Sequence, residues 1–392
     1  MVDPVPQLES LPVERGTRVL VRADFNVPLR DGVIDDDLRI TAALPTIEYL
    51  RKRGAKVVCC SHLGRPKGKV DPQYSLAPVA QRLGELLGAT VELSPQVAGF
   101  ESLGMSQGIE PGAVMMIENL RFDPGEEANN PSFATNLSQL GDAYVDDAFG
   151  AAHRAHASIV GPPRVLPAAA GRLLAREVEV LGGLLDAPKR PFFGVLGGVK
   201  VSDKLGVIDA LLQHCDTLLI GGAMAFTFLV AQGGRVGDSL VEADQVGHCR
   251  ELLASGRIEI PTDVVVAQAM SAETPTQHVR ADAIPDGWKG LDIGPETAGH
   301  YADTIGGAAT VLWNGPMGVF ELAPFEAGTR TVAQAVADCR GFTVVGGGDS
   351  ASAVRHLGLG ERIDHVSTGG GASLELIELG DLPGLQALRK PT

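Results

Sequence analysis

The chain has 392 residues, of which 44% are hydrophobic and 21% are charged, as in ordinary soluble globular proteins. This length exceeds what one hydrophobic core usually serves and predicts two domains. The formal net charge of −15 argues against a broad surface for nucleic acid or for anionic membranes, because such surfaces need excess Lys and Arg. The five scattered cysteines predict neither a disulfide framework nor a zinc site. With no signal-peptide pattern and no long apolar stretch, we expect a cytoplasmic protein without a membrane segment.

Short apolar runs alternate with segments of helical pattern, which is typical of βαβ units with parallel, buried strands. In chain order the predicted strands lie in residues 18–24, 55–61, 113–120, 143–149, 191–198, 216–222, 263–268, 309–315, 342–349 and 364–371. So many strands are too many for one comfortable open sheet. The pattern therefore predicts an α/β protein with more than one sheet.

A break between domains is predicted at 161–190, where a leucine-rich helical stretch lies between proline-containing segments. We interpret residues 171–186 as a connecting helix between an N-terminal domain, 1–170, and a C-terminal domain, 187–373. The last segment, from about 374 to 392, has the pattern of one helix followed by a short tail. Its pattern does not say which domain it packs against.

Arginines follow the predicted strands of the first half. Ligands of α/β sheets bind at the carboxyl ends of strands. The arginines near these ends are Arg22, Arg39, Arg65, Arg121 and Arg154. Guanidinium groups bind phosphate and carboxylate oxygens bidentately, so the set predicts a pocket for a compact polyanion. Asp24 and Asn26 suit hydroxyl groups, which favours a substrate with both a hydroxyl group and anionic ends.

Glycine-rich turns take the place of arginines in the second half, at 195–204, 313–321 and 344–352. Such turns bring backbone N–H groups and helix N-termini close to phosphate. Lys200 and Lys204 are four residues apart, so they would share one face if their segment were helical and could meet successive phosphates. The alternative is a pair of exposed lysines on a surface helix.

The turn GGGDSA matches a dinucleotide fingerprint through Gly346, Gly348 and Ala351, but the following predicted strand ends in glycines rather than in an acidic residue. Asp349 lies inside the turn and would repel phosphates unless a divalent cation such as Mg²⁺ lay between them. We therefore favour a magnesium–nucleotide site. An NAD(P)-dependent oxidoreductase and a non-catalytic metabolite-binding protein remain alternatives. The Walker A motif and the protein-kinase H-R-D motif are both absent from the sequence.

The motifs RADFNVP, SHLGRP, ENLRF, AHRAHAS, GGVKVSDK, WNGPMGVFE, GGGDSA and STGGGAS occur in this order between residues 22 and 373. Together they closely resemble the motifs of phosphoglycerate kinases. The resemblance implies two α/β domains of similar size, Rossmann-like with parallel sheets flanked by helices and joined by a helix and hinge. It also implies a monomer whose C-terminal tail returns to the N-terminal domain. The implied reaction is reversible phosphoryl transfer between 1,3-bisphosphoglycerate and MgADP, giving 3-phosphoglycerate and MgATP, with no nucleic acid or membrane as partner.

Matching motifs carry the family's site residues onto this chain. The substrate-binding residues so implied are Arg22, Asp24, Phe25, Asn26, Arg39, His62, Leu63, Gly64, Arg65, Arg121 and Arg154. The nucleotide-binding residues are Lys200, Lys204, Gly290, Asn314, Glu321, Gly347, Gly348, Asp349 and Ser350, with Asp349 at the metal. Arg39, Lys200, Gly348 and Gly371 are implied to act on the transferred group. Departures such as Val199 for alanine, Ala23 for valine and Ser350 for threonine remove no charge or hydroxyl group.

Overall fold

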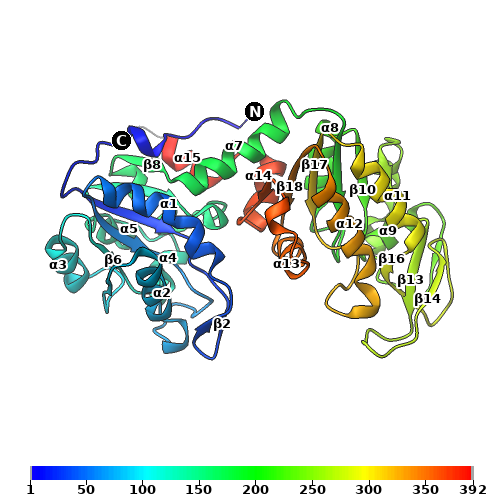
Figure 1. Ribbon diagram of the computed structural model, residues 1–392, viewed down its shortest axis with the longest axis horizontal. Coiled ribbons are helices and arrows are strands. Elements are labelled where there is room, and N and C mark those ends of the chain that lie inside the picture. The colour runs from blue at the N-terminus through cyan, green and yellow to red at the C-terminus, as the bar shows by residue number, and fades with distance from the viewer. Residues whose placement is uncertain (1, 390–392) are drawn as a thin grey trace. The chain divides into compact units, whose positions relative to one another are not determined.

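The computed structural model describes residues 2–389 and divides into two compact units, each built of helices and strands (Figure 1). One unit is formed by the chain up to Val180 together with the segment from Leu379 onward, and the other by Leu181–Glu378. The predicted tail about 374–392 thus divides between the units, and its residues 390–392 lie outside the described part.

A six-stranded parallel sheet forms the centre of the first unit. Its strands are β1 (Arg18–Ala23), β4 (Lys56–Cys60), β5 (Val91–Leu93), β6 (Val114–Met116), β7 (Ala143–Asp147) and β8 (Ala168–Ala170), in the order β5-β6-β4-β1-β7-β8. The connections contain α1 (Leu38–Lys52), α2 (Ala77–Leu87), α3 (Phe100–Gly108), α4 (Pro124–Glu127), α5 (Pro131–Ser138), α6 (Ala157–Val160) and the hairpin β2 (Leu29–Arg30) and β3 (Val33–Ile34). The side chains of β7 are buried throughout, as expected of a strand covered on both faces.

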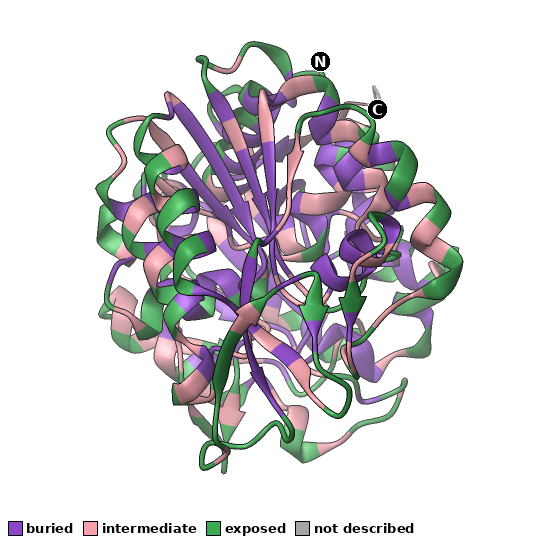
Figure 2. Cartoon of the chain, turned by 90° about the vertical axis from the view of Figure 1, so that its right-hand side faces the viewer, coloured by how far each residue is buried: buried purple, intermediate pink, exposed green. Residues whose placement is uncertain are grey.

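The second unit also has a six-stranded parallel sheet, in the order β12-β10-β9-β17-β18-β19. These strands are β9 (Phe192–Leu196), β10 (Thr217–Ile220), β12 (Ile258–Glu259), β17 (Thr310–Asn314), β18 (Phe342–Gly346) and β19 (His365–Val366). The helices are α8 (Leu205–His214), α9 (Ala225–Ala231), α10 (Val246–Leu253), α11 (Pro295–Gly306), α12 (Ala327–Asp338), α13 (Gly348–His356) and α14 (Gly371–Leu379). In Figure 2 the long central strands are largely buried, whereas exposed residues lie on loops, on outer helix turns and on some shorter strands. The predicted α/β class with parallel sheets flanked by helices is confirmed.

Some local predictions were wrong. The apolar run at 263–268 forms β13 (Asp263–Ala267), which pairs antiparallel with β14 (Gln277–Arg280) and β16 (Lys289–Ile293) rather than joining the parallel sheet. A buried apolar run looks the same in either kind of sheet, and the polar sequence of β14 gave no strand signal. Very short strands were missed for the same lack of signal: β5, β8 and β12, and the pair β11 (Arg235–Val236) and β15 (Ala283–Ile284).

The C-terminal segment contains two helices rather than one. Helix α14 ends at Leu379, and α15 (Pro383–Arg389) follows after a turn in which Gly380 has a φ of 72°. Only glycine adopts that angle without strain, and Pro383 fits the first turn of the new helix. Both signals were present in the sequence, so the single predicted helix was an error of interpretation.

The helix predicted at 171–186 is present as α7 (Arg172–Asp186). Its N-terminus is fixed by Asp147, whose Oδ1 accepts hydrogen bonds from the backbone N–H groups of Leu173 at 2.9 Å and Leu174 at 3.3 Å. Gly171 makes this approach possible, because a Cβ there would lie 2.1 Å from the same oxygen. None of the helices in the described part of the chain is long and apolar enough to span a bilayer.

Candidate active site

The carboxyl edge of the first sheet collects the residues predicted to bind the substrate. Arg22 lies in β1, and Asp24, Phe25 and Asn26 follow it directly. His62, Leu63, Gly64 and Arg65 follow β4; Arg121 lies in the 3-10 helix Leu120–Phe122 after β6; and Arg154 follows the 3-10 helix Phe149–Ala151 after β7. Because these strands are parallel, their carboxyl ends lie on one edge, which brings the separated motifs together.

Arg39 and Asp24 form an ion pair at this edge, with Arg39 Nη1 2.8 Å from Asp24 Oδ2. Arg39 lies in the first turn of α1, and its side chain keeps a relative exposure of 33%, whereas the side chain of Asp24 is buried. The pair therefore orients a guanidinium group whose other donors can still reach a ligand.

Arg22 is enclosed, with a relative exposure of 1%. Its Nη1 donates to the carbonyl oxygen of Ala23 at 2.5 Å, and its Nη2 donates to His62 Nδ1 at 3.1 Å. Burial and the nearby Arg22, Arg121 and Arg39 hold the pKa of His62 well below its usual value. His62 is therefore a neutral imidazole at physiological pH.

The other predicted substrate residues divide by accessibility. Arg121 is buried and donates from Nη1 to the carbonyl oxygen of Gly64 at 2.7 Å, while Asn26 Oδ1 accepts from the Gly64 N–H at 2.9 Å. Arg65 is exposed and Arg154 is partly exposed. These contacts fix the turn that carries Arg65.

The side chains of Phe25 and Leu63 belong to the core, and their backbone N–H groups are already bonded, to Ser61 Oγ at 2.8 Å and Asn119 Oδ1 at 3.2 Å. Sequence reasoning did not single out Asn119. Its Nδ2 also donates to the carbonyl oxygens of Leu63 at 2.7 Å and Tyr74 at 2.9 Å, so it organises the loop after β4. Its place in the ENLRF motif was the available signal.

A cavity of about 870 Å³ lies in the second unit, where its predicted site residues come together. The predicted residues that line it are Lys204, Gly290, Asn314, Glu321, Gly347, Gly348, Asp349, Ser350 and Gly371. They come mainly from the carboxyl ends of β17 and β18 and from the starts of the helices that follow. Lys200 is exposed and lies outside this lining.

Lys204 is the residue before α8, and its Nζ donates to the carbonyl oxygen of Gly197 at 2.7 Å and to Asn314 Oδ1 at 2.6 Å. Burial lowers the pKa of Lys204 to about 8, although Asp349 and Asp203 oppose the shift. The predicted helical face shared with Lys200 does not form, because residues 197–204 are a loop and the helix begins at Leu205.

The turn after β18 has the geometry of an anion-binding helix start. Gly347 has a φ of 90°, and α13 begins at Gly348 with the exposed Asp349 in its first turn. Ser350 Oγ is engaged by the backbone, accepting from the Gly315 N–H at 2.8 Å and donating to the Gly346 carbonyl at 2.6 Å. Among the residues that the structure describes, the buried Asn314 Nδ2 has no hydrogen-bond partner. The cavity thus offers helix N–H groups and a free amide donor to a phosphate.

An apolar part of the wall suits a flat ring. Gly290 in β16 is buried, and a Cβ at this position would lie 2.1 Å from Cζ of Phe226. Leu240, Met270 and Val319 also line the cavity. These apolar residues were not predicted from the sequence, because isolated hydrophobic residues carry no motif.

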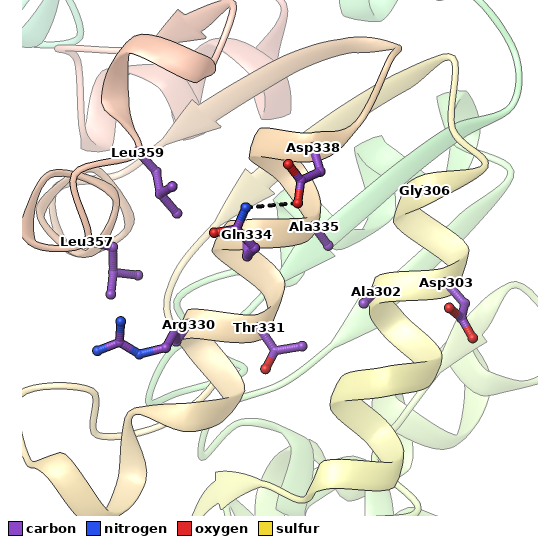
Figure 3. Close-up of a pocket in the computed structure, with 10 residues that line it drawn as sticks. All are labelled: Ala302, Asp303, Gly306, Arg330, Thr331, Gln334, Ala335, Asp338, Leu357 and Leu359. Carbon is purple, nitrogen blue, oxygen red and sulfur yellow. Dashed lines mark hydrogen bonds between the residues drawn. The ribbon is translucent and has the colours of Figure 1, made fainter.

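A second depression of about 540 Å³ lies on this unit among residues of α11, α12 and the segment after α13 (Figure 3). Its polar groups bond mainly to one another and to near neighbours. Asp338 accepts from Gln334 Nε2 at 2.8 Å and pairs with Arg362, while Arg330 Nη2 donates to Glu326 at 2.7 Å. The described lining includes none of the predicted site residues.

The comparisons with known proteins agree over nearly the whole chain. Residues 9–379 match the phosphoglycerate kinase family. The chain is 55% identical over 380 residues to the phosphoglycerate kinase of Roseiflexus castenholzii and 58% identical over 382 residues to that of Salinispora arenicola; each alignment covers 95% of this chain and 96% of the relative. This chain belongs to the phosphoglycerate kinase family. The solved phosphoglycerate kinase of Coxiella burnetii superposes with a TM-score of 0.88 at 39% identity, covering 98% of this chain and 99% of that one.

Membership in this family identifies the chain as a transferase of the kinase class. Neither the oxidoreductase nor the non-catalytic alternative finds support.

Proposed function

We propose that this chain catalyses the reversible transfer of a phosphoryl group between 1,3-bisphosphoglycerate and MgADP, giving 3-phosphoglycerate and MgATP, a step of glycolysis and gluconeogenesis. The observation that carries the proposal is the arginine-rich edge of the first unit, where Arg39 is held by Asp24 and still reaches solvent. A protein with a net charge of −15 needs such a local cationic cluster to hold a small polyanion.

The first unit, up to about residue 180 with the C-terminal segment, is proposed to bind 3-phosphoglycerate. Arg65, Arg121 and Arg154 supply positive charge for the phosphate and carboxylate groups. Asp24 and Asn26 suit the substrate hydroxyl. The neutral imidazole of His62 can contribute one N–H donor without adding a further charge to a crowded cationic edge.

The second unit is proposed to bind the nucleotide in the 870 Å³ cavity. The apolar wall at Phe226 and Gly290 suits the adenine ring, and Lys204 with the start of α13 suits the phosphates. No cluster of three or more acidic, histidine or cysteine side chains that could hold a metal occurs in the described chain. Asp349 as a single carboxylate at the cavity still fits Mg²⁺, which keeps several waters and binds largely through substrate phosphates. When bound, Mg²⁺ neutralises charge on the nucleotide phosphates.

The chain's own groups then position the reactants and neutralise charge. The acceptor carboxylate carries no proton, so no general base is needed. Arg39, Lys200 and the N–H groups of Gly348 and Gly371 are proposed to stabilise the oxygens of the moving phosphoryl group. Because the two substrates are assigned to different units, the proposal includes a hinge motion that brings them together and excludes water. The proposal also includes a cytoplasmic location and a monomeric state, of which the monomeric state rests on the family resemblance alone.

A coupled assay tests this function. Purified protein receives 3-phosphoglycerate and MgATP, and NADH oxidation by added glyceraldehyde-3-phosphate dehydrogenase reports the acyl phosphate. We expect turnover that requires both substrates and Mg²⁺. A folded, monodisperse sample without turnover would refute the proposed reaction. A reaction mixture without the purified protein is the control for background activity in the added coupling enzyme.

A further inference from the structure

A buried chain of hydrogen bonds lies behind the arginine-rich edge of the first unit. It links Glu126 at the end of α4, Ser158 in α6, Arg22 in β1 and His62 after β4. Glu126 and Ser158 both have a relative exposure of 0%. Sequence reasoning singled out neither of these two residues.

The direction of each bond is determined by the chemistry of the donors. Arg22 Nε can only donate, so Ser158 Oγ accepts from it at 3.0 Å. The single hydroxyl hydrogen of Ser158 is then free to point at Glu126 Oε1, which lies 2.6 Å away. The Ser158 N–H donates to the other oxygen, Glu126 Oε2, at 2.9 Å. Both carboxyl oxygens therefore act as acceptors.

This arrangement matches an ionised Glu126 that balances the charge of the enclosed Arg22. The pKa of Glu126 lies above its ordinary value, because burial raises it by more than Arg22 and the two Ser158 donors lower it. The acceptor role of both carboxyl oxygens is what indicates the ionised form. An arginine with 1% exposure needs such a partner, because an unpaired buried charge is strongly destabilising.

The buried chain of hydrogen bonds also determines the tautomer of His62. Arg22 Nη2 lies 3.1 Å from His62 Nδ1 and can only donate, so Nδ1 is the acceptor and the ring proton of the neutral imidazole lies on Nε2. If Arg22 turned away, Nδ1 would lose this donor and the two tautomers would exchange. The tautomer of His62, a residue predicted to bind the substrate, thus depends through Arg22 on Ser158 and Glu126, which lie behind it.

We propose that Glu126 and Ser158 are positioning residues for the 3-phosphoglycerate site, acting through Arg22 to hold His62 as an Nε2–H donor. This inference rests on the proposed substrate of the first unit. It assigns Arg22 a supporting role, since the structure engages its Nε and both Nη atoms with protein groups.

The negative charge of Glu126, taken alone, would weaken 3-phosphoglycerate binding rather than support it. A negative charge behind an anion site repels the ligand, so Glu126→Gln should tighten 3-phosphoglycerate binding if only its charge mattered. If Glu126 acts by positioning, the same change weakens binding, because an amide has one acceptor oxygen for the two donors of Ser158. The sign of the change separates the two explanations.

The experiment measures dissociation constants for 3-phosphoglycerate and for MgADP separately, by calorimetry, in wild type, Ser158→Ala and Glu126→Gln. Ser102→Ala is the matched control, because Ser102 is also fully buried in the first unit and donates from Oγ to a backbone oxygen, that of Gln96, at 2.9 Å. We expect both test variants to bind 3-phosphoglycerate roughly tenfold more weakly and MgADP within about twofold of wild type. The control should retain both affinities.

A second measurement needs no substrate. Nitrogen-15 NMR of the imidazole rings should report an Nε2–H tautomer for His62 in wild type and in Ser102→Ala, and a mixed population in Ser158→Ala. An unchanged tautomer, unchanged 3-phosphoglycerate affinity in folded Ser158→Ala, or tighter binding in Glu126→Gln would each overturn the positioning role. If wild type itself bound no 3-phosphoglycerate, the proposed function would fail, and the tautomer measurement would still decide whether the buried chain controls His62.

Discussion

Nucleotide binding should depend on pH through Lys204. The half-buried ammonium group has a pKa of about 8 instead of its ordinary 10.5, so it begins to lose its charge at mildly alkaline pH. Nucleotide phosphates near Nζ would favour the charged form and raise this pKa. Binding therefore takes up a proton when the free protein is partly deprotonated, and the affinity falls as the pH rises through 8.

The magnitude follows from the fraction of charged lysine. At pH 8 about half of the free protein lacks the proton, so binding should take up about half a proton. At pH 9 about nine-tenths lacks it, which predicts a roughly tenfold weaker MgADP affinity than at pH 7 if binding requires the charged form. The same depressed pKa makes the stability of the fold rise with pH, whereas the nucleotide affinity falls. The charged lysine costs stability below pH 8, and this cost is relieved between pH 8 and 10.5.

Calorimetry from pH 7 to pH 9.5, in buffers that differ in ionisation enthalpy, measures both the affinity and the proton uptake. Lys204→Met should bind weakly and lose the pH slope. Lys200→Met removes an exposed lysine outside the cavity lining and should keep the slope. A dissociation constant that stays constant to pH 9.5 without proton uptake, or a slope that persists in Lys204→Met, would refute this reasoning.

Three further changes have expected outcomes. Arg39→Ala should lower kcat by about a hundredfold, or roughly 3 kcal/mol, in the coupled assay, and near-normal turnover would exclude its proposed role. Asp349→Ala should weaken MgADP binding by calorimetry and leave 3-phosphoglycerate affinity unchanged, whereas equal loss of both would indicate misfolding. Burial raises the pKa of Asp147 to about 7 from 3.8, so its favourable contribution to stability is present below 3.8 and is lost as the pH rises through 7. Asp147→Asn should therefore gain in thermal stability relative to wild type by about 5 °C more at pH 8 than at pH 5, and a constant difference would contradict the shift.

The fold was predictable where strands are buried on both faces. Parallel strands such as β1 and β17 leave continuous apolar runs, which the sequence displays directly. The apolar pattern of a strand does not show with which other strands it pairs. The run in β13 is as apolar as its parallel counterparts, yet it pairs with the largely exposed β14 and with β16, and only tertiary packing makes that choice.

The sequence predicted which residues belong to the candidate site better than it predicted the role of each residue. The sequence predicted an anion-binding role for both Arg22 and Arg39 from their places near strand ends, and the family resemblance added a role on the transferred group for Arg39. The structure encloses Arg22 between Ser158 and His62 and leaves a third of the Arg39 side chain accessible. Those partners lie 136 and 40 residues from Arg22 in the chain, so no local pattern around it distinguishes a supporting arginine from one that can contact a ligand.

The same distinction applies to the glycine turn of the second unit. Ser350 and Asp349 are neighbours in one motif, but the hydroxyl of Ser350 joins the ends of β17 and β18 while the carboxylate of Asp349 faces solvent at the cavity. A helix start places successive side chains about 100° apart around its axis, so one neighbour turns into the sheet and the other away from it. A serine-to-alanine change at 350 should therefore affect the turn itself, because it removes the bridge between Gly315 and Gly346, whereas Asp349→Ala leaves that bridge intact. Supporting and ligand-binding roles within one motif thus separate by which way each side chain points, and that direction becomes visible only once the helix is placed against its sheet.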